Sequence, residues 1–140
     1  MKSFKWSLAV VALCVVAVGC AKQTTKKETK SDKLQSVYFD FDASDIKSEA
    51  EAKLKSNADW LSKNSKVKAQ VQGNCDERGT NEYNIALGDR RAKSASKYLT
   101  NLGIDKSRLS TISYGEEKPV CTGHDESCWW QNRRDDTVQQ

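Results

Sequence analysis

The sequence predicts a single α/β domain, an α+β sandwich in which helices cover one face of one sheet. Three observations support this fold class. Short segments alternate apolar and polar residues, and longer segments between them carry apolar residues at helical spacing. About a hundred residues remain beyond the N-terminal leader and tether described below, enough for one hydrophobic core. The sequence contains no internal repeat and no second domain.

The first two expected elements are a strand and a helix. The strand covers residues 37–42, where apolar and polar side chains alternate and define one buried face. The helix begins with a capping box formed by Ser48 and Glu51 and continues with an apolar stripe. The alternating apolar residues of the strand are Val37, Phe39 and Phe41, and those of the helix are Ala50, Leu54, Ala58 and Leu61.

A second strand, a long helix and a third strand follow. The second strand runs from Val67 to Val71 and ends before Gly73. The long helix stops near Gly103, because glycine commonly terminates helices. Its expected buried face consists of Ile85, Gly88, Ala92, Ala95, Leu99 and Leu102. The third strand covers residues 109–114 and leads into a turn.

The N-terminus has the features of a lipoprotein signal peptide, which we place at residues 1–19. Two lysines precede an apolar run from Leu8 to Val18, which is shorter than the roughly 20 residues of a membrane-spanning helix. Residues 17–20, Ala-Val-Gly-Cys, resemble a bacterial lipobox. Cys20 is therefore the expected first residue of the mature protein, carrying acyl chains. An ordinary signal peptide cut elsewhere, or an uncleaved anchor, is the alternative.

Residues 20–34 are the expected tether, and residues 35–140 the domain. The tether is rich in lysine, glutamine, threonine and serine, with Leu34 as its only sizeable apolar side chain, so it cannot offset its ordering entropy by burial. Removal of the leader takes two lysines and lowers the formal net charge from +4 to about +2. This charge is too small, and too concentrated in the tether, to favour nucleic acid as a partner.

The most informative segment lies between residues 74 and 91. Asp76 follows the second strand directly, at the rim of the sheet, where loops carry function. Asn84, Leu87 and Arg91 share one helix face because they are spaced i, i+3 and i+7. An acid at the rim and an arginine roughly 10 Å into the helix can hold both ends of a zwitterion. The planar guanidinium would hold the carboxylate end.

With residues 37–42 (VYFDFD) and 112–119 (ISYGEEKP), this segment closely resembles the OmpA-like C-terminal domain family, in particular its peptidoglycan-associated lipoproteins. The resemblance covers roughly residues 37–134. It implies a βαβαβ fold that ends in a further strand. It also implies a non-enzymatic outer-membrane lipoprotein whose periplasmic domain binds peptidoglycan non-covalently. Partners implied by the resemblance are TolB and other proteins of the Tol-Pal system, which supports envelope integrity and cell division.

The resemblance also implies the residues of a binding site, with no cofactor and no metal. In the family, the residues matching Asp76 and Arg91 are the principal contacts to meso-diaminopimelate, which carries an ammonium and a carboxylate at its free end. The remaining pocket residues match Phe41, Asp42, Asn84 and Leu87. The neighbouring charged residues Glu77, Arg78 and Arg90 are expected to form a solvated rim. An Asp76–Arg91 ion pair that merely holds the loop is the structural alternative.

The C-terminal segment matches the family less well. Residues 132–134 (NRR) match the start of the family's last strand, but the apolar alternation of relatives is missing after them. Val138 is the only clear candidate for an inward side chain. We therefore expect the final strand to be short or frayed.

The cysteines suggest one disulfide. Without Cys14 of the leader and Cys20, three remain, so at least one thiol is unpaired unless it bonds another molecule. Cys121 and Cys128 flank a polar, glycine-containing loop that can bring its ends to the roughly 5.5–6 Å Cα separation of a disulfide. We predict a Cys121–Cys128 bond and a free Cys75, with a bond from Cys75 to either partner as the competing connectivity.

Three other functions remain as alternatives. Cys75 could act as a nucleophile with His124, the single histidine, as its base, although no oxyanion-forming motif is evident. A zinc site could use Cys75, Cys121, His124 and Cys128, but an oxidising compartment favours a disulfide. The domain could also be a wall-binding module of a motor or secretion assembly, although relatives of that kind usually add a membrane helix or a second domain.

Overall fold

The computed structural model describes residues 33–140. The expected leader, Cys20 and nearly all of the tether lie outside the described residues, so the predictions for them stay predictions. Packing begins at the expected boundary of the domain, where Leu34 contacts the core and the backbone N–H of Gln35 donates to Asn57 Oδ1 at 2.8 Å. Within residues 33–140, none of the helices has the length and apolar character needed to cross a membrane.

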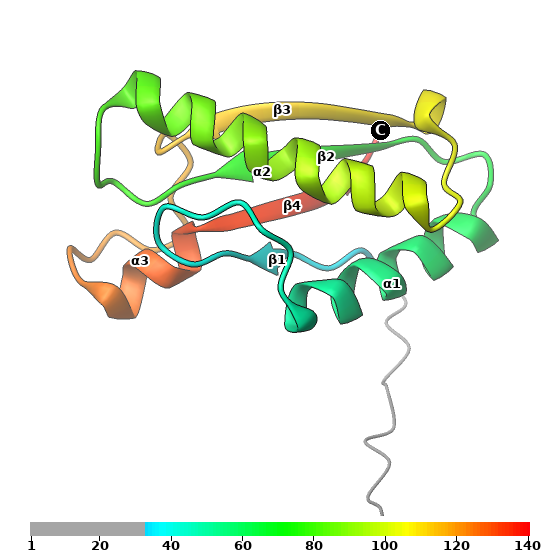
Figure 1. Ribbon diagram of the computed structural model, residues 1–140, viewed down its shortest axis with the longest axis horizontal. Coiled ribbons are helices and arrows are strands. Elements are labelled where there is room, and N and C mark those ends of the chain that lie inside the picture. The colour runs from blue at the N-terminus through cyan, green and yellow to red at the C-terminus, as the bar shows by residue number, and fades with distance from the viewer. Residues whose placement is uncertain (1–32) are drawn as a thin grey trace, which may run out of the picture.

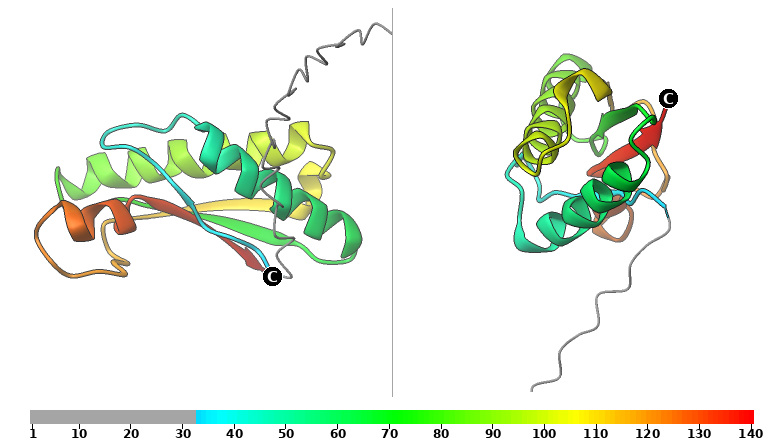
Figure 2. Two further views of the ribbon diagram at one scale, coloured as in Figure 1. Left: turned by 90° about the horizontal axis from the view of Figure 1, so that it is seen from below. Right: turned by 90° about the vertical axis from the view of Figure 1, so that its right-hand side faces the viewer.

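The described chain is a two-layer sandwich of one mixed sheet and two long helices (Figure 1). In chain order its elements are β1 (Val37–Tyr38), α1 (Ser48–Lys63), β2 (Ala69–Asn74), α2 (Asn81–Asn101), the 3-10 helix η1 (Lys106–Arg108), β3 (Leu109–Gly115), α3 (Glu126–Asn132) and β4 (Arg134–Gln139). The strand order is β1-β4-β2-β3, with β3 parallel to β2 and β4 antiparallel to both of its neighbours. Figure 2 shows α1 and α2 on the same face of the sheet. The predicted fold class is therefore confirmed.

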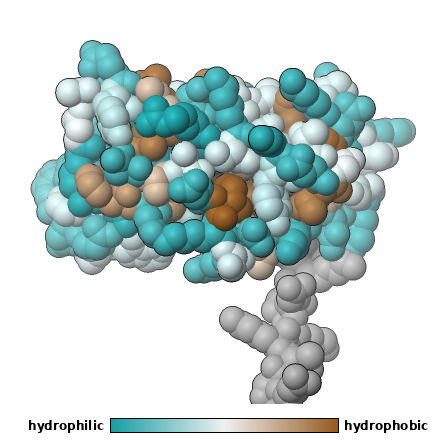
Figure 3. Space-filling model, viewed as in Figure 1, coloured by the Kyte–Doolittle hydropathy of each residue, from teal (hydrophilic) through white to brown (hydrophobic). Residues whose placement is uncertain are grey.

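The hydrophobic core lies between α1, α2 and the sheet. It is built from the buried side chains Val37, Phe39, Ala50, Leu54, Ala58, Leu61, Ala69, Val71, Ala92, Ala95, Leu99 and Ile104. On the outside, hydrophilic residues cover most of the face seen in Figure 3, and apolar residues appear there as separate small patches. The core therefore collects most of the alternating and helically spaced apolar residues that the sequence predicts.

Two glycines bring α2 unusually close to β2. A Cβ atom added to Gly73 would lie 2.0 Å from the carbonyl oxygen of Gly88, and one added to Gly88 would lie 2.3 Å from Ser113 Oγ. Such a close approach of two backbones leaves no space for a side chain. It holds the first half of α2 against the end of β2, where the 74–91 segment lies.

Several predicted boundaries differ from the structure. The capping box is wrong: Lys47 is the N-cap of α1, and it makes no side-chain cap hydrogen bond. The first strand ends at Tyr38, although the backbone N–H of Phe39 still donates to the Arg133 carbonyl at 2.9 Å. The side chain of Phe41 is 57% exposed, so it does not belong to the buried face. β2 also starts later than predicted, at Ala69.

The buried face of α2 is rotated relative to the prediction. Ile85 and Leu102, which the spacing places in the core, are both exposed. Leu87 and Arg91 are buried instead, together with the predicted Gly88 and the residues of the second half. The helix therefore turns part of its first half toward a polar, buried region and not toward the apolar core.

The expectation that the final strand is short or frayed is wrong. β4 comprises 6 residues and lies inside the sheet, between β1 and β2. Its most buried side chains beyond the first residue are Asp135 and Thr137, whereas Val138 is only half-buried. Because polar residues take the inward positions, the apolar alternation that marks most buried strands is absent from this one.

Candidate functional site

A pocket of about 170 Å³ opens where the turn after β1, the end of β2 and the start of α2 meet. All six residues expected to form the binding site line it: Phe41, Asp42, Asp76, Asn84, Leu87 and Arg91. Further residues in its lining are Cys75, Arg78, Gly79, Tyr83 and Arg133. The structure thus brings together two segments that are far apart in the sequence and adds Arg133, which lies between α3 and β4.

Asp76 is a buried carboxylate held by two arginines. Arg78 donates to it from its backbone N–H at 3.0 Å, from Nε at 3.2 Å and from NH2 at 2.6 Å. Arg133 NH1 donates to the second oxygen at 3.1 Å. Burial alone would raise the pKa of Asp76, but these hydrogen bonds lower it below its ordinary value. Asp76 pairs with Arg78 and Arg133, so the alternative of an Asp76–Arg91 ion pair is wrong.

Arg91 is fully buried and connects two backbone segments. Its Nε donates to the carbonyl of Ala43 at 2.7 Å, its NH1 to that of Asn74 at 3.0 Å and its NH2 to that of Asp40 at 2.9 Å. These contacts tie the turn after β1 to the end of β2. Burial lowers the pKa of Arg91, but an arginine stays charged in a protein. NH1 also contacts Cys75 Sγ at 3.5 Å, so one of the five N–H donors of the guanidinium, on NH2, remains for a ligand in the pocket that Arg91 lines.

The turn between Asp40 and Ala43 places Asp42 at the mouth of the pocket. Asp42 has a φ of +56°, the left-handed conformation that aspartate tolerates better than most residues. Its carboxylate accepts a hydrogen bond from the hydroxyl of Tyr83. Tyr83 is a site residue that the sequence interpretation missed, although its place in the first turn of α2, beside Asn84, could have suggested it.

The loop between β2 and α2 is fixed by local hydrogen bonds. Gly79 has a φ of +114°, which a glycine adopts without strain and which turns the chain toward the helix. Thr80 caps α2, because its Oγ1 accepts a backbone N–H of the first turn at 3.2 Å. Asn84 Nδ2 donates to the carbonyls of Asp76 at 3.3 Å and Arg78 at 3.2 Å. Asn84 therefore fixes the conformation of the loop by hydrogen bonds and also lines the pocket.

Arg78 forms one wall of the pocket, and its assignment to a solvated rim is wrong. Its guanidinium carbon lies 4.0 Å from the ring centroid of Phe41 and 4.1 Å from that of Trp129, so two aromatic rings hold it by cation–π contacts. Trp129 Nε1 in turn donates to Glu77 Oε1 at 2.8 Å. The predicted rim residues thus have separate roles: Arg90 lies 5.8 Å from the ring centroid of Tyr83 and does not line the pocket.

Arg133 is the second site residue that the sequence interpretation missed. It is buried, and besides Asp76 it bonds the carbonyl of Phe39 from Nε at 3.1 Å and the carboxylate of Glu126. Burial would lower the pKa of Arg133, but the hydrogen bonds to the two carboxylates raise it. Three guanidinium groups and two carboxylates therefore line the pocket, which suits a ligand with both an anionic and a cationic group.

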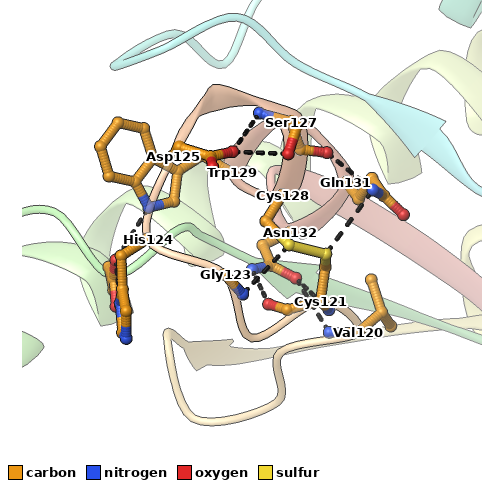
Figure 4. Close-up of a disulfide and its surroundings, with 11 residues drawn as sticks. Val120, Cys121, Gly123, His124, Asp125, Ser127, Cys128, Trp129, Gln131 and Asn132 are labelled. Carbon is orange, nitrogen blue, oxygen red and sulfur yellow. Dashed lines mark hydrogen bonds and ion pairs between the residues drawn. A yellow bond between two sulfur atoms is a disulfide. The ribbon is translucent and has the colours of Figure 1, made fainter.

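A disulfide links α3 (Glu126–Asn132), the helix that carries Trp129, to the segment before it (Figure 4). It joins Cys121 to Cys128, whose Cα atoms are 5.1 Å apart, and Cys75 is free and buried, the same assignment that the sequence predicts. Asn132 Oδ1 accepts the backbone N–H of Cys121 at 3.1 Å, and its Nδ2 donates to the carbonyl of the same residue at 2.7 Å. The disulfide thus joins α3, a helix that the sequence interpretation treated as loop, to the segment that precedes it.

The described residues give no support to the catalytic and zinc alternatives. Burial raises the pKa of the Cys75 thiol to about 11, and its Sγ donates to the carbonyl of Asn84 at 3.3 Å. His124, the proposed base, lies on the surface and contacts Glu77 at 2.8 Å instead. Cys121 and Cys128 are consumed by the disulfide, and residues 33–140 contain no other cluster of metal-binding side chains. A mostly protonated, hydrogen-bonded thiol is a poor nucleophile at neutral pH.

Comparisons with known proteins identify the family of the chain. Residues 38–128 match the OmpA family. The peptidoglycan-associated lipoprotein of Rhizobium meliloti (strain 1021) is 48% identical over 102 residues, which cover 73% of this chain and 58% of that protein. The protein of the same name from Pseudomonas putida is 44% identical over 116 residues, covering 83% of this chain and 69% of that one. The chain thus spans a little over half the length of the first of these relatives.

Solved structures show the same similarity. The crystal structure of the peptidoglycan-associated lipoprotein from Burkholderia pseudomallei has a TM-score of 0.72 and 46% identity, with 75% of this chain and 89% of that chain covered. The C-terminal domain of Helicobacter pylori MotB has a TM-score of 0.71 at 20% identity, with 77% and 85% covered, which shows a shared fold alone. The chain therefore belongs to the OmpA family, within its branch of peptidoglycan-associated lipoproteins.

Proposed function

We propose that this domain binds peptidoglycan non-covalently, by holding the free ammonium and carboxylate of meso-diaminopimelate. The observation that carries the proposal is the pocket that unites all six expected site residues with acidic and basic groups. Asp76 and Asp42 receive the ammonium, and the remaining N–H donor of Arg91 receives the carboxylate. Phe41 and Leu87 contact the apolar stem of the ligand.

The family of the chain supports a binding role over a catalytic one. The OmpA family is one of structural modules and not of enzymes, and the relatives reported above are named for an association with peptidoglycan. The pocket has the matching chemistry, because its buried carboxylate has a lowered pKa and stays ionised at neutral pH. A charged, preorganised pair of sites can hold a zwitterion without any chemical step.

The wider role follows from the N-terminal sequence and the family. Acyl chains on Cys20 would anchor the protein in the outer membrane, with its domain in the periplasm, so that binding links the membrane to the wall. TolB and other Tol proteins are the proposed partners, in support of envelope integrity and cell division. The alternative, a wall-binding module of a motor or secretion assembly, is favoured by weaker similarities, at 20% identity to MotB and at 26% identity to the cell wall anchor of the T6SS from Pseudomonas aeruginosa.

Co-sedimentation with purified peptidoglycan tests the binding site. Asp76→Asn removes the charge but keeps the shape, so the variant should bind diaminopimelate-type wall at least about tenfold more weakly, the equivalent of one charged hydrogen bond. Arg91→Lys should also weaken binding, because a point charge does not replace the planar fork. Asp59→Asn, an exposed acid on α1, is the matched control. If both site variants sediment like the wild type, the proposed site is wrong.

The type of wall gives a second control. Wall with lysine in place of diaminopimelate lacks the terminal carboxylate, so the wild type should bind it weakly. Equal sedimentation with both types of wall would show that the pocket does not recognise the terminal carboxylate of diaminopimelate. Mass spectrometry of the mature protein tests the anchor separately: Cys20 should be the N-terminal residue and carry acyl mass, and Cys20→Ser should abolish the modification.

A further inference from the structure

A second hollow, of about 200 Å³, adjoins the candidate site. The two hollows share Arg133, and successive residues of one segment line them in turn. Phe39 and Asp40 line the second hollow, and Phe41 and Asp42 line the first. The two hollows therefore lie next to each other along this segment.

The second hollow has an exposed aromatic platform. The side chain of Trp130 is 47% exposed, although tryptophan is usually well buried. Its ring centroid lies 5.4 Å from that of Tyr38, with the planes tilted by 54°. Lys53 Nζ lies 4.7 Å from the centroid of the Tyr38 ring. Contacts with both neighbours thus hold Tyr38 in place, and Trp130 keeps part of its indole open to solvent.

Charged side chains lie beside this platform. Asp40, Lys47 and Glu49 line the same hollow, and all three are exposed. The adjacent tryptophan has a different environment, because Trp129 contacts Arg78 in the wall of the first hollow. Of the two successive tryptophans of α3, Trp129 thus packs on a residue of the first hollow and Trp130 lines the second.

We propose that the second hollow is a subsite for an amino-sugar residue of the glycan strand of peptidoglycan, which rests on the proposed binding of diaminopimelate in the first hollow. One face of a pyranose ring presents C–H groups, which stack on an exposed indole. The hydroxyl and acetamido groups around the ring need donors and acceptors, which the ion pairs Lys47–Asp40 and Lys53–Glu49 supply through the donors and oxygens that each pair leaves open. An apolar surface with a few convergent polar groups is the usual composition of a small-molecule site.

The length of the ligand is compatible with the spacing along the protein chain. In the stem peptide two residues separate diaminopimelate from the sugar, and two extended residues span roughly 7 Å. On the protein, Tyr38 and Phe41 are three residues apart in the chain, a separation of at most roughly 11 Å. The short lactyl group that joins the peptide to the sugar covers the rest of this distance.

Binding of two soluble ligands tests the subsite. The ligands are a disaccharide tripeptide of peptidoglycan that ends in diaminopimelate and the same tripeptide without sugars, measured by isothermal titration with the mature protein. The wild type should bind the disaccharide form roughly threefold to tenfold more tightly, the range expected for one aromatic contact. Trp130→Ala should remove this difference and leave the affinity for the tripeptide unchanged, whereas Trp130→Phe should retain most of it.

The controls separate the subsite from the site beside it. Ile112→Ala removes an exposed apolar side chain from β3, away from both hollows, and should change neither affinity. Equal affinity of the wild type for the two ligands, or an equal loss for both in Trp130→Ala, would overturn the subsite while leaving the diaminopimelate site in place. Failure of the wild type to bind the tripeptide at all would overturn the proposed function and the subsite together.

Discussion

The two halves of α2 bury different kinds of side chain. The first half buries Asn84 and Arg91 beside Leu87, and the second half buries Ala92, Ala95 and Leu99. A buried leucine contributes about 1.5–3 kcal/mol by leaving water, whereas a buried arginine is tolerated only when its donors have partners. The apolar half therefore stabilises the fold. The polar half contributes less to stability and holds charged groups in a fixed arrangement beside the pocket.

The largest effect should come from the buried arginine. Arg91→Ala leaves the carbonyls of Ala43, Asn74 and Asp40 without their donor, so the free energy of unfolding should fall by about 3 kcal/mol or more. Leu99→Ala, in the other half of the helix, should cost about 2–5 kcal/mol through cavity formation. Urea unfolding measures both. Folded Leu99→Ala should still bind the wall, and loss of its binding would remove the distinction between the two halves.

The disulfide should have the next largest effect. Replacing Cys121 and Cys128 by serine should lower the free energy of unfolding by about 2–3 kcal/mol, because the unfolded chain gains freedom. Dithiothreitol should lower the thermal midpoint of the wild type and leave that of the double variant unchanged. A wild type insensitive to the reductant, in a sample shown to be reduced, would contradict this role for the bond.

The close contact between α2 and β2 gives the next prediction. Gly73→Ala should destabilise the fold by about 1–3 kcal/mol, because the new Cβ meets the backbone carbonyl of Gly88. Gly88→Ala should cost less, since its nearest obstacle is the side-chain hydroxyl of Ser113. Combining it with Ser113→Ala should restore part of the loss in thermal midpoint. Equal effects of the two single variants would show that the helix shifts as a body.

The smallest effect concerns pH. Asp135 is fully buried, neither of its carboxylate oxygens has a hydrogen-bond partner, and burial raises its pKa well above the ordinary value. Above roughly pH 4 the unfolded chain releases this proton while the folded chain keeps it. The group therefore stabilises the fold at low pH, and this contribution is lost as pH rises through the raised pKa. The slope is at most about 1.4 kcal/mol per pH unit.

Asp135→Asn isolates that contribution. Thermal midpoints of the wild type and the variant, measured from pH 3 to pH 8, should differ by an amount that shifts in favour of the variant as pH rises. Asp105 is a suitable contrast, because its hydrogen bonds with Ser107 lower its pKa, so Asp105→Asn should shift the difference in the opposite direction. Parallel curves for the wild type and Asp135→Asn would mean that the carboxyl titrates normally.

The sequence predicts the parts of the molecule that depend on local spacing. The fold class, the order of the first three strands and the two long helices, and the shared face of Asn84, Leu87 and Arg91 follow from periods of two and of about 3.6 residues. The parts it misses depend on distant partners. Arg133 reaches Asp76 across 57 positions of sequence, and β4 carries the polar residues Asp135 and Thr137 at its buried positions. No local pattern encodes either feature.

The place of β4 in the sheet also determines the order in which the domain can assemble. β2, α2 and β3 form a continuous unit of the chain whose strands pair directly with each other. Among the described strands, β1 by contrast pairs with β4 alone, and β4 follows the other three in sequence although it lies between β1 and β2. The same late segment brings Arg133 to Asp76. The described domain therefore has neither its four-stranded sheet nor the Arg133–Asp76 contact of its pocket until β4 and the residue before it are in place.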